Sequence, residues 1–368
     1  MDFRLTEERQ MLQDALRRFL ADTVTPEGIV EATGTATGFA PALWEQLTEL
    51  GLPGAMFTEE QGGFGGAGFD LMVVFEELGR AGLSVPLVET VLSGALLDAA
   101  GMPVDDLAGG QILALAHTEP AARYDLNRVD TRAERTAEGW RVIGQKAVVH
   151  HAPAAKAILL TARTSGAADA EEGISLFLVT PADVTLRDYP LQGGGRAAEL
   201  TIDATLPESA LIGPAGTAFD ALQTAHARAT AALCAEALGM METVKTLTVD
   251  YLRQRRQFGQ PIGKFQALQH RMADVLIEIE QARSAVINLC GNLDGPDRDL
   301  HVSATKNLIG RTARLVVEEA IQMHGGIGMT MEYALGHFAK RLTMVDHRFG
   351  DTDYHLERFI RQAKSRAS

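Results

Sequence analysis

The chain has 368 residues, 46% of them hydrophobic, and its 34 basic and 48 acidic residues give a formal net charge of −14. This acidic balance does not favour binding to nucleic acid or to an anionic membrane. The chain has only two cysteines, which excludes a disulfide scaffold or a cysteine-based zinc site. The first twenty residues lack the apolar segment and basic start of a secretory signal, and no apolar run reaches the roughly 18 residues of a membrane span, so we expect a reduced, cytoplasmic, multidomain globular protein.

Residues 1–110 are predicted to form an N-terminal helical domain. In the first segment, apolar side chains recur every three or four residues, with acidic residues early and arginines late, as in an amphipathic helix. These apolar positions are Leu5, Met11, Leu12, Ala15, Leu16, Phe19 and Leu20. The helical pattern returns at 44–47 and 71–78, and glycine and proline punctuate the turns between.

Residues 111–216 are predicted to form a middle β domain, either a small barrel or a sandwich. Short apolar runs, rich in β-branched residues, alternate there with turn residues. The runs are Ile112–Ala116, Trp140–Ile143, Ala157–Leu160 and Ile174–Val179. The segment Arg163–Gly173 is rich in Gly, Ala, Asp and Glu, and we expect a hairpin tip or a mobile loop.

Residues 217–368 are predicted to form a C-terminal four-helix-bundle domain. Long amphipathic segments of suitable length for antiparallel helices follow one another there. The segments are Ala218–Gln257, Gln266–Asn292, Leu300–Met323, Tyr333–Arg348 and Tyr354–Ala367. The fold class is therefore α+β, with a sheet domain between two helical domains.

Two sequence patterns that could indicate a dinucleotide site or a metal site are better explained by structural roles. Gly63–Gly68 matches G-x-G-x-x-G, but its flanks are helical and acidic rather than a strand and a helix, so we interpret it as an interhelical loop. The acidic and histidine residues at 346–355 span a helix end and a helix start, and Asp351 is better placed as an N-cap. We therefore predict no metal site. Cys234 and Cys290 fall on apolar helical faces and are expected to be buried.

Two long motifs carry a resemblance to a known family. The first is Arg255–Gln269, RRQFGQPIGKFQALQ, and the second is Gln322–Thr330, QMHGGIGMT, followed by Glu332 and Tyr333. Thr118-Glu119-Pro120 is a third, shorter match at the start of the β region. Together with the α–β–α order, these motifs resemble the acyl-CoA dehydrogenase superfamily over essentially the whole chain.

The resemblance implies an FAD cofactor and identifies the residues that bind it. A pyrophosphate requires a fixed cation and backbone N–H groups, and glycine lets the backbone approach it closely. The matching residues are Arg255, Phe258, Gln266, Gln322, Gly325 and Gly326, which in the family act on a neighbouring subunit's FAD, together with Thr118 in the β region.

The positions that supply the catalytic base in the family carry no acid here. Relatives remove the α-proton of an acyl-CoA thioester with a carboxylate, and the β-hydride passes to the flavin. The usual glutamate position, before a glycine, is Phe349 in this chain. The alternative position, beside an arginine on the first long C-terminal helix, is Ala227.

The flavin pocket of the β region also departs from the family pattern. The family's Gly-Ser pair after Thr-Glu-Pro is replaced by Arg123 and Tyr124. The tryptophan and threonine of the strand that lies against the flavin are replaced by Val148 and His150. The chain's own pocket is therefore altered, whereas the residues that act on a neighbour's FAD are kept.

This asymmetry resembles the base-lacking subunit of actinobacterial heteromeric acyl-CoA dehydrogenases, including those that act on steroid side-chain thioesters. It implies an α2β2 assembly with a glutamate-bearing paralogue, an acyl-CoA substrate and an electron-accepting flavoprotein. Three alternatives stay open: a homo-oligomeric enzyme with a relocated base, first of all Asp351 and then Glu332 or Asp346; a flavin monooxygenase; and a binding protein without flavin chemistry. The length of the acyl chain is not predictable from these residues.

Overall fold

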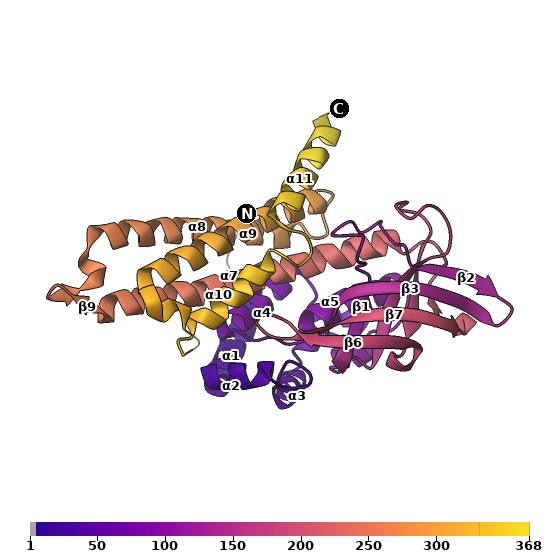
Figure 1. Cartoon of the computed structure of the whole chain (residues 1–368), viewed down its shortest axis with the longest axis horizontal. Helices are drawn as coiled ribbons and strands as arrows, with labels where there is room; N and C mark the ends of the chain where they lie inside the picture. The colour runs from indigo at the N-terminus through magenta and orange to yellow at the C-terminus, as the bar shows by residue number, and fades with distance from the viewer. Residues whose placement is uncertain (1–4, 331, 368) are drawn as a thin grey trace. The chain divides into compact units, whose positions relative to one another are not determined.

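The computed structural model describes residues 5–330 and 332–367, and the chain forms two compact units built from separate segments (Figure 1). The helical unit comprises Met1–Val30, Gly68–Leu83 and Thr230–Ser368. The sheet unit comprises Glu31–Ala67 and Ser84–Ala229. In the described part of the chain, no helix is long and apolar enough to cross a membrane.

The predicted C-terminal helices are confirmed, with ends shifted by three residues or fewer. They are α7 (Phe219–Gln254), α8 (Gln266–Gly291), α9 (Arg298–His324), α10 (Leu335–Val345) and α11 (Thr352–Ala367). The helical unit also contains α1 (Glu7–Thr23), α4 (Gly68–Ala81) and the start of α2 (Pro26–Thr33). Cys234 and Cys290 are both buried, as predicted.

Two glycines let α4 and α7 pack backbone against backbone in the helical unit. A Cβ on Gly79 would lie 1.9 Å from the carbonyl oxygen of Glu236, and a Cβ on Gly239 would lie 1.9 Å from that of Glu76. Because these atoms belong to the backbone, a larger residue at either position would force the helices apart.

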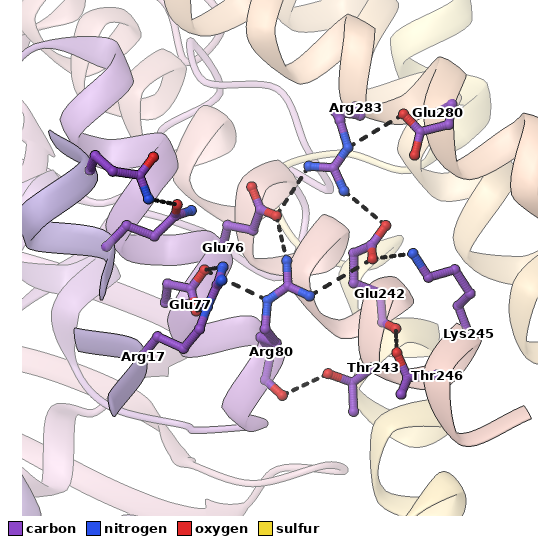
Figure 2. Close-up of polar contacts among 12 residues, drawn as sticks. Arg17, Glu76, Glu77, Arg80, Glu242, Thr243, Lys245, Thr246, Glu280 and Arg283 are labelled. Atoms are coloured by element: carbon purple, nitrogen blue, oxygen red, sulfur yellow. Dashed lines mark hydrogen bonds and ion pairs between the residues drawn. The ribbon is translucent and has the colours of Figure 1, made fainter. Parts of the chain in front are cut away.

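A network of ion pairs joins α1, α4, α7 and α8 beside this contact (Figure 2). The carboxylates of Glu76, Glu77 and Glu242 are almost fully buried. Arg80 Nη2 lies 2.7 Å from Glu76 Oε1, and Arg283 bridges Glu76 and Glu242 at 3.1 and 2.8 Å. Each buried carboxylate therefore has cationic partners, which buried charges require.

The sheet unit is built on an eight-stranded sheet, with strand order β6-β7-β3-β2-β4-β5-β8 and β1 paired in parallel to β4. The strands are β1 (Leu113–Ala116), β2 (Arg132–Thr136), β3 (Gly139–His150), β4 (Ala157–Arg163), β5 (Ile174–Val179), β6 (Val184–Pro190), β7 (Arg196–Leu206) and β8 (Leu211–Ile212). The unit also contains α3 (Pro41–Glu49), α5 (Leu87–Ala99) and α6 (Asp105–Ala108).

The four predicted apolar runs all lie in strands, but β2, β6 and β7 were not predicted. In β6, half-buried residues alternate with exposed ones, and in β2 only Ala133 is buried. Such strands lack a continuous apolar run, because only one of their faces is covered.

The segment 163–173 is the tip of the β4–β5 hairpin, and one buried arginine orders it. Arg163 is 1% exposed and donates to backbone carbonyls rather than to a carboxylate. The acceptors include the carbonyl oxygens of Asn127, Val129, Ala168, Ala170 and Glu172. Burial lowers the pKa of this guanidinium. The expectation of a hairpin tip is confirmed, and the loop is tied to its neighbours by this side chain.

The glycine motif at 63–68 is an interhelical loop, as predicted. It follows a 3-10 turn at Glu59–Gln61 and precedes α4. A Cβ on Gly63 or Gly65 would lie 2.3 Å from a backbone carbonyl oxygen, of Gly54 and Ala55 respectively. These glycines are therefore required by close backbone packing within the sheet unit.

Candidate functional site

An aromatic stack brings the two C-terminal motifs together in the helical unit. The rings of Tyr251, near the end of α7, and His324, at the end of α9, stack with centroids 4.5 Å apart. Tyr333 contacts both rings, at 6.4 and 5.2 Å. His324 Nδ1 donates to the carbonyl oxygen of Ala320, and burial lowers the pKa of the imidazole. A neutral histidine in the second motif thus contacts the end of α7, four residues before Arg255.

The first motif forms a two-residue hairpin that presents an aromatic side chain. Strands β9 (Arg256–Gln257) and β10 (Gln260–Pro261) pair antiparallel, and the turn residues Phe258 and Gly259 have φ of +51° and +80°. Positive φ at both turn positions matches a type I′ turn, which is unusual for phenylalanine. The Phe258 side chain is 91% exposed. A large, exposed aromatic residue in a strained turn is available for contacts outside the chain.

The second motif exposes backbone where it leaves α9. Gly325 has φ of +67°, and a Cβ built on Gly325 or Gly326 would meet no described atom within 4 Å. Gln322, Arg255 and Gln266 are also exposed. All six residues predicted to act on a neighbour's cofactor therefore lie on the accessible surface of the helical unit.

Phe349 sits at the usual base position in a loop that is firmly anchored. Its φ is +59°, and its carbonyl oxygen accepts a hydrogen bond of 2.8 Å from His355 Nε2. The next carbonyl, of Gly350, accepts a 2.6 Å hydrogen bond from the buried Lys306 Nζ. Burial, then the nearby Lys306, lowers the pKa of His355 to about 3, so the imidazole is neutral. These two contacts offset the cost of the left-handed backbone at a phenylalanine.

Asp351, the fallback candidate for the base, is used at the start of α11. Its Oδ1 accepts a 2.8 Å hydrogen bond from the backbone N–H of Tyr354, as an N-cap does. Asp346 likewise accepts from the backbone N–H and the hydroxyl of Thr352, at 3.0 and 2.7 Å. Both carboxylates thus stabilise the junction between α10 and α11.

Ala227, the other expected base position, is buried on α7 in the sheet unit. It is 3% exposed, and the neighbouring Arg228 donates to the carbonyl oxygen of Gly66. Arg228 is therefore oriented by the glycine loop. At 227 itself, a methyl side chain offers no proton acceptor.

A buried ion pair underlies the Thr-Glu-Pro motif of the sheet unit. Lys146 Nζ lies 2.6 Å from Glu119 Oε1, and the two side chains are 0% and 3% exposed. The Glu119 carboxylate also accepts the backbone N–H groups of Asp130 and Thr131, at 2.6 and 3.1 Å. Burial lowers the pKa of Lys146 to about 8 despite the opposing effect of Glu119, so the ammonium is still charged at pH 7. This pair fixes exposed Thr118, whose carbonyl oxygen accepts from Ala147 N–H.

A neutral histidine completes this buried cluster. His117 Nδ1 lies 2.9 Å from Thr161 Oγ1, which is also 3.1 Å from Lys146 Nζ. Burial, followed by nearby His226 and Lys146, holds the pKa of His117 well below its usual range. The sequence did not identify His117, Lys146 or Thr161 as partners. The nearest signal was Glu119, an acid that follows the apolar strand β1 by three residues.

Strand β3, in which Val148 and His150 depart from the family pattern, contains a β-bulge. Lys146 pairs with Leu200, but Val149 pairs with Ala198, so one extra residue is inserted between them. Val148 has φ of +52° and a side chain that is 43% exposed. The bulge keeps both Lys146 and Val149 buried and turns Val148 outward.

Comparison with known proteins identifies the family of this chain. Models of the acyl-CoA dehydrogenase N-terminal, middle and C-terminal domains match residues 6–103, 114–203 and 216–366. Acyl-CoA dehydrogenase IpdE2 of Mycobacterium tuberculosis is 32% identical and covers 91% of both chains. The ChsE4-ChsE5 complex from Mycobacterium tuberculosis has a TM-score of 0.88 at 25% identity, over 99% of both chains. The Tcur3481-Tcur3483 steroid ACAD has a TM-score of 0.88 at 27% identity, over 98% and 99%.

The chain belongs to the acyl-CoA dehydrogenase family, whose members are oxidoreductases acting on the CH–CH bond of acyl-CoA, and FAD is its cofactor. The residues present fit this cofactor. Gly325 and Gly326 leave their backbone open, where a Cβ would keep a phosphate at a distance, and Arg255 is an exposed cation in the same helical unit.

Proposed function

We propose that this chain is the subunit of a heteromeric acyl-CoA dehydrogenase that completes a partner's FAD site and does not supply the base. One observation carries this proposal: Phe349 and Ala227 occupy both base positions, while the residues that act on a neighbour's cofactor are exposed. A cofactor shared across an interface makes the division possible, because only one of two half-sites must be complete.

Two of the similar structures support a heteromeric assembly. Both ChsE4-ChsE5 and Tcur3481-Tcur3483 pair two differently named chains, and the second is described as a steroid enzyme. By analogy, we propose an assembly of two copies each of this chain and a glutamate-bearing paralogue. Its substrate is an acyl-CoA thioester of fatty-acid or steroid catabolism, and its electrons pass to a flavoprotein acceptor.

The proposed roles follow from the chemistry of the exposed side chains. FAD accepts the hydride when bound, and the protein positions it. Arg255 neutralises the pyrophosphate, and the backbone N–H groups at Gly325 and Gly326 approach it, with Gln322 beside them. Gln266 donates to the cofactor, and Phe258 packs on its adenine or flavin. Thr118 belongs to this chain's own half-site, which the proposal leaves without flavin.

The alternative of a relocated base receives less support. The carboxylates of Asp351 and Asp346 accept hydrogen bonds from backbone and hydroxyl donors, which hold both side chains at the start of α11. Glu332 is exposed, in the segment that follows the second motif. A general base has to reach the α-carbon of the substrate. None of these three carboxylates stands at position 349 or 227, where relatives have their base.

Replacement of Arg255 tests the cofactor role directly. In the assembled oligomer, Arg255→Ala should weaken FAD retention about 10–100-fold, because a charge-assisted contact is worth about 1.5–3 kcal/mol. Flavin content after dialysis, measured by absorbance, gives the result. Both Arg255 and Arg256 are exposed, so neither substitution should unfold the chain.

Arg256→Ala is the matched control, since it removes the same charge one residue away, within β9. It should retain flavin nearly as well as the unmodified oligomer. Equal flavin retention in the two variants would show that Arg255 has no special role and that the motif assignment is wrong.

A further inference from the structure

A cavity of about 320 Å³ lies within the helical unit, and none of the six predicted cofactor-binding residues of that unit lines it. Segments of α1, α2, α4, α7 and α10 surround it. Its wall is mainly apolar and includes Leu20, Val24, Ile29, Ala81, Leu247 and Phe338. This volume falls at the lower end of the roughly 300–1,000 Å³ found for small-molecule sites, which are typically apolar with a few placed polar groups.

Four polar residues of the cavity wall, Arg17, Glu77, Arg80 and Thr243, belong to the network of Figure 2, and Thr25 and His337 also line the cavity. Arg17 Nε and Nη2 donate to the two oxygens of Glu77 at 2.9 and 2.6 Å. Arg80, on the other side of Glu77, also pairs with Glu76 and Glu242. Thr243 donates to the carbonyl oxygen of Arg80 at 2.8 Å. The polar end of the cavity is therefore rigid before any ligand arrives.

Arg17 is the most exposed of the three charged groups at this end of the cavity. Glu77 is 1% exposed and is already paired with two guanidinium groups, whereas the Arg17 side chain is 47% exposed. Within residues 5–330 and 332–367, no hydrogen bond is formed by Arg17 Nη1. A fixed guanidinium with a spare N–H donor is suited to a carboxylate.

We propose that this cavity binds an aliphatic carboxylate of medium chain length, with the chain against the apolar wall and the carboxylate at Arg17. The apolar lining favours a hydrocarbon body over a polar one, because its burial removes apolar surface from water. The site is separate from the cofactor residues, and the inference does not rest on the proposed subunit role.

Calorimetric titration of the assembled protein with decanoate tests this site, with decanol as the uncharged analogue. Decanoate should bind with one site per chain and at least tenfold tighter than decanol. Ala21→Trp places a large side chain in the lining from the exposed face of α1 and should abolish binding. Ala15→Trp, exposed on the same helix but outside the lining, should leave it unchanged.

The charge of Arg17 is tested by Arg17→Gln, which should weaken decanoate at least tenfold and decanol hardly at all. Arg18→Gln is its control, since Arg18 is exposed and its side chain donates to the carbonyl oxygen of Asp14 rather than to a carboxylate. If Arg17→Gln does not fold, Ala21→Trp still decides the location of the site. Unchanged decanoate binding in Ala21→Trp, equal binding of decanol, or no binding of either would each overturn the proposal.

Discussion

The chain purified alone should show no acyl-CoA dehydrogenase activity and should hold well under one FAD per chain. General-base catalysis contributes about 10²–10⁴-fold to rate, and neither Phe349 nor Ala227 can accept a proton. Turnover should therefore stay near background even when FAD is added. The measurement is anaerobic bleaching of the flavin by a panel of short, branched and steroid-type acyl-CoA thioesters.

Restoring one acid should not restore activity. Phe349→Glu and Ala227→Glu each return a carboxylate, but we expect Arg123, Tyr124 and the outward-turned Val148 still to alter the chain's own flavin pocket. The left-handed loop at Phe349 is held by backbone carbonyl contacts, so a glutamate there should keep the same geometry. Failure of both variants would locate the defect in the pocket as well as in the base.

Co-expression with a glutamate-bearing paralogue is the experiment in which we expect activity. The pair should form a mixed oligomer with about one FAD per two chains and should reduce an artificial electron acceptor. A flavin monooxygenase would give a different outcome, because it would consume oxygen when reduced flavin is supplied. Rapid bleaching of the lone chain at full flavin occupancy would refute the subunit proposal and direct attention to Asp351.

The fold was largely predictable because its main elements carry complete hydrophobic patterns. The helices α7 to α11 show apolar spacing over many turns, and β1, β4 and β5 are continuous apolar runs. In contrast, β2, β6 and β7 contain no continuous apolar run. Residues 200–206 of β7 alternate apolar and polar side chains, a strand pattern that a search for continuous apolar runs misses. The pairing of β7 with β3 joins segments distant in the chain, so local patterns do not reveal which strands pair.

The candidate site was predictable only where a motif repeats a family pattern. Arg255 and Gly325 were predicted in this way, and their role in cofactor binding stays a prediction. The contacts that support them were not: Tyr251 and His324 are 73 residues apart, and their stacking depends on how α7 and α9 pack. Similarly, nothing in the sequence pairs Lys146 with Glu119, because a buried ion pair forms from the convergence of separate strands rather than from local spacing.

That buried pair should dominate the stability of the sheet unit, and Glu119→Gln tests it. The substitution leaves the ammonium of Lys146, which is 0% exposed, with only neutral acceptors. Removing one partner of a buried pair costs about 3–5 kcal/mol. Both tryptophans, Trp44 and Trp140, lie in the sheet unit, so tryptophan fluorescence during urea unfolding reports this unit. Glu134→Gln, exposed on β2, is the control and should change little.

The loss should depend on pH in a direction set by Glu119. Burial raises the pKa of this carboxyl, but Lys146 and the N–H donors of Thr131 and Asp130 outweigh burial and lower it below 4.5. A lowered folded-state pKa stabilises the protein above the unfolded value, and the benefit is lost as pH falls through the folded value. The difference in unfolding free energy between the unmodified chain and Glu119→Gln should therefore have its full size at pH 6–7, about two units above the ordinary glutamate pKa of 4.5. It should shrink as the pH falls below about 4.5. A difference that stayed constant down to the acid limit, or one no larger than that of Glu134→Gln at pH 7, would show that the ion pair does not hold the Thr-Glu-Pro segment in place.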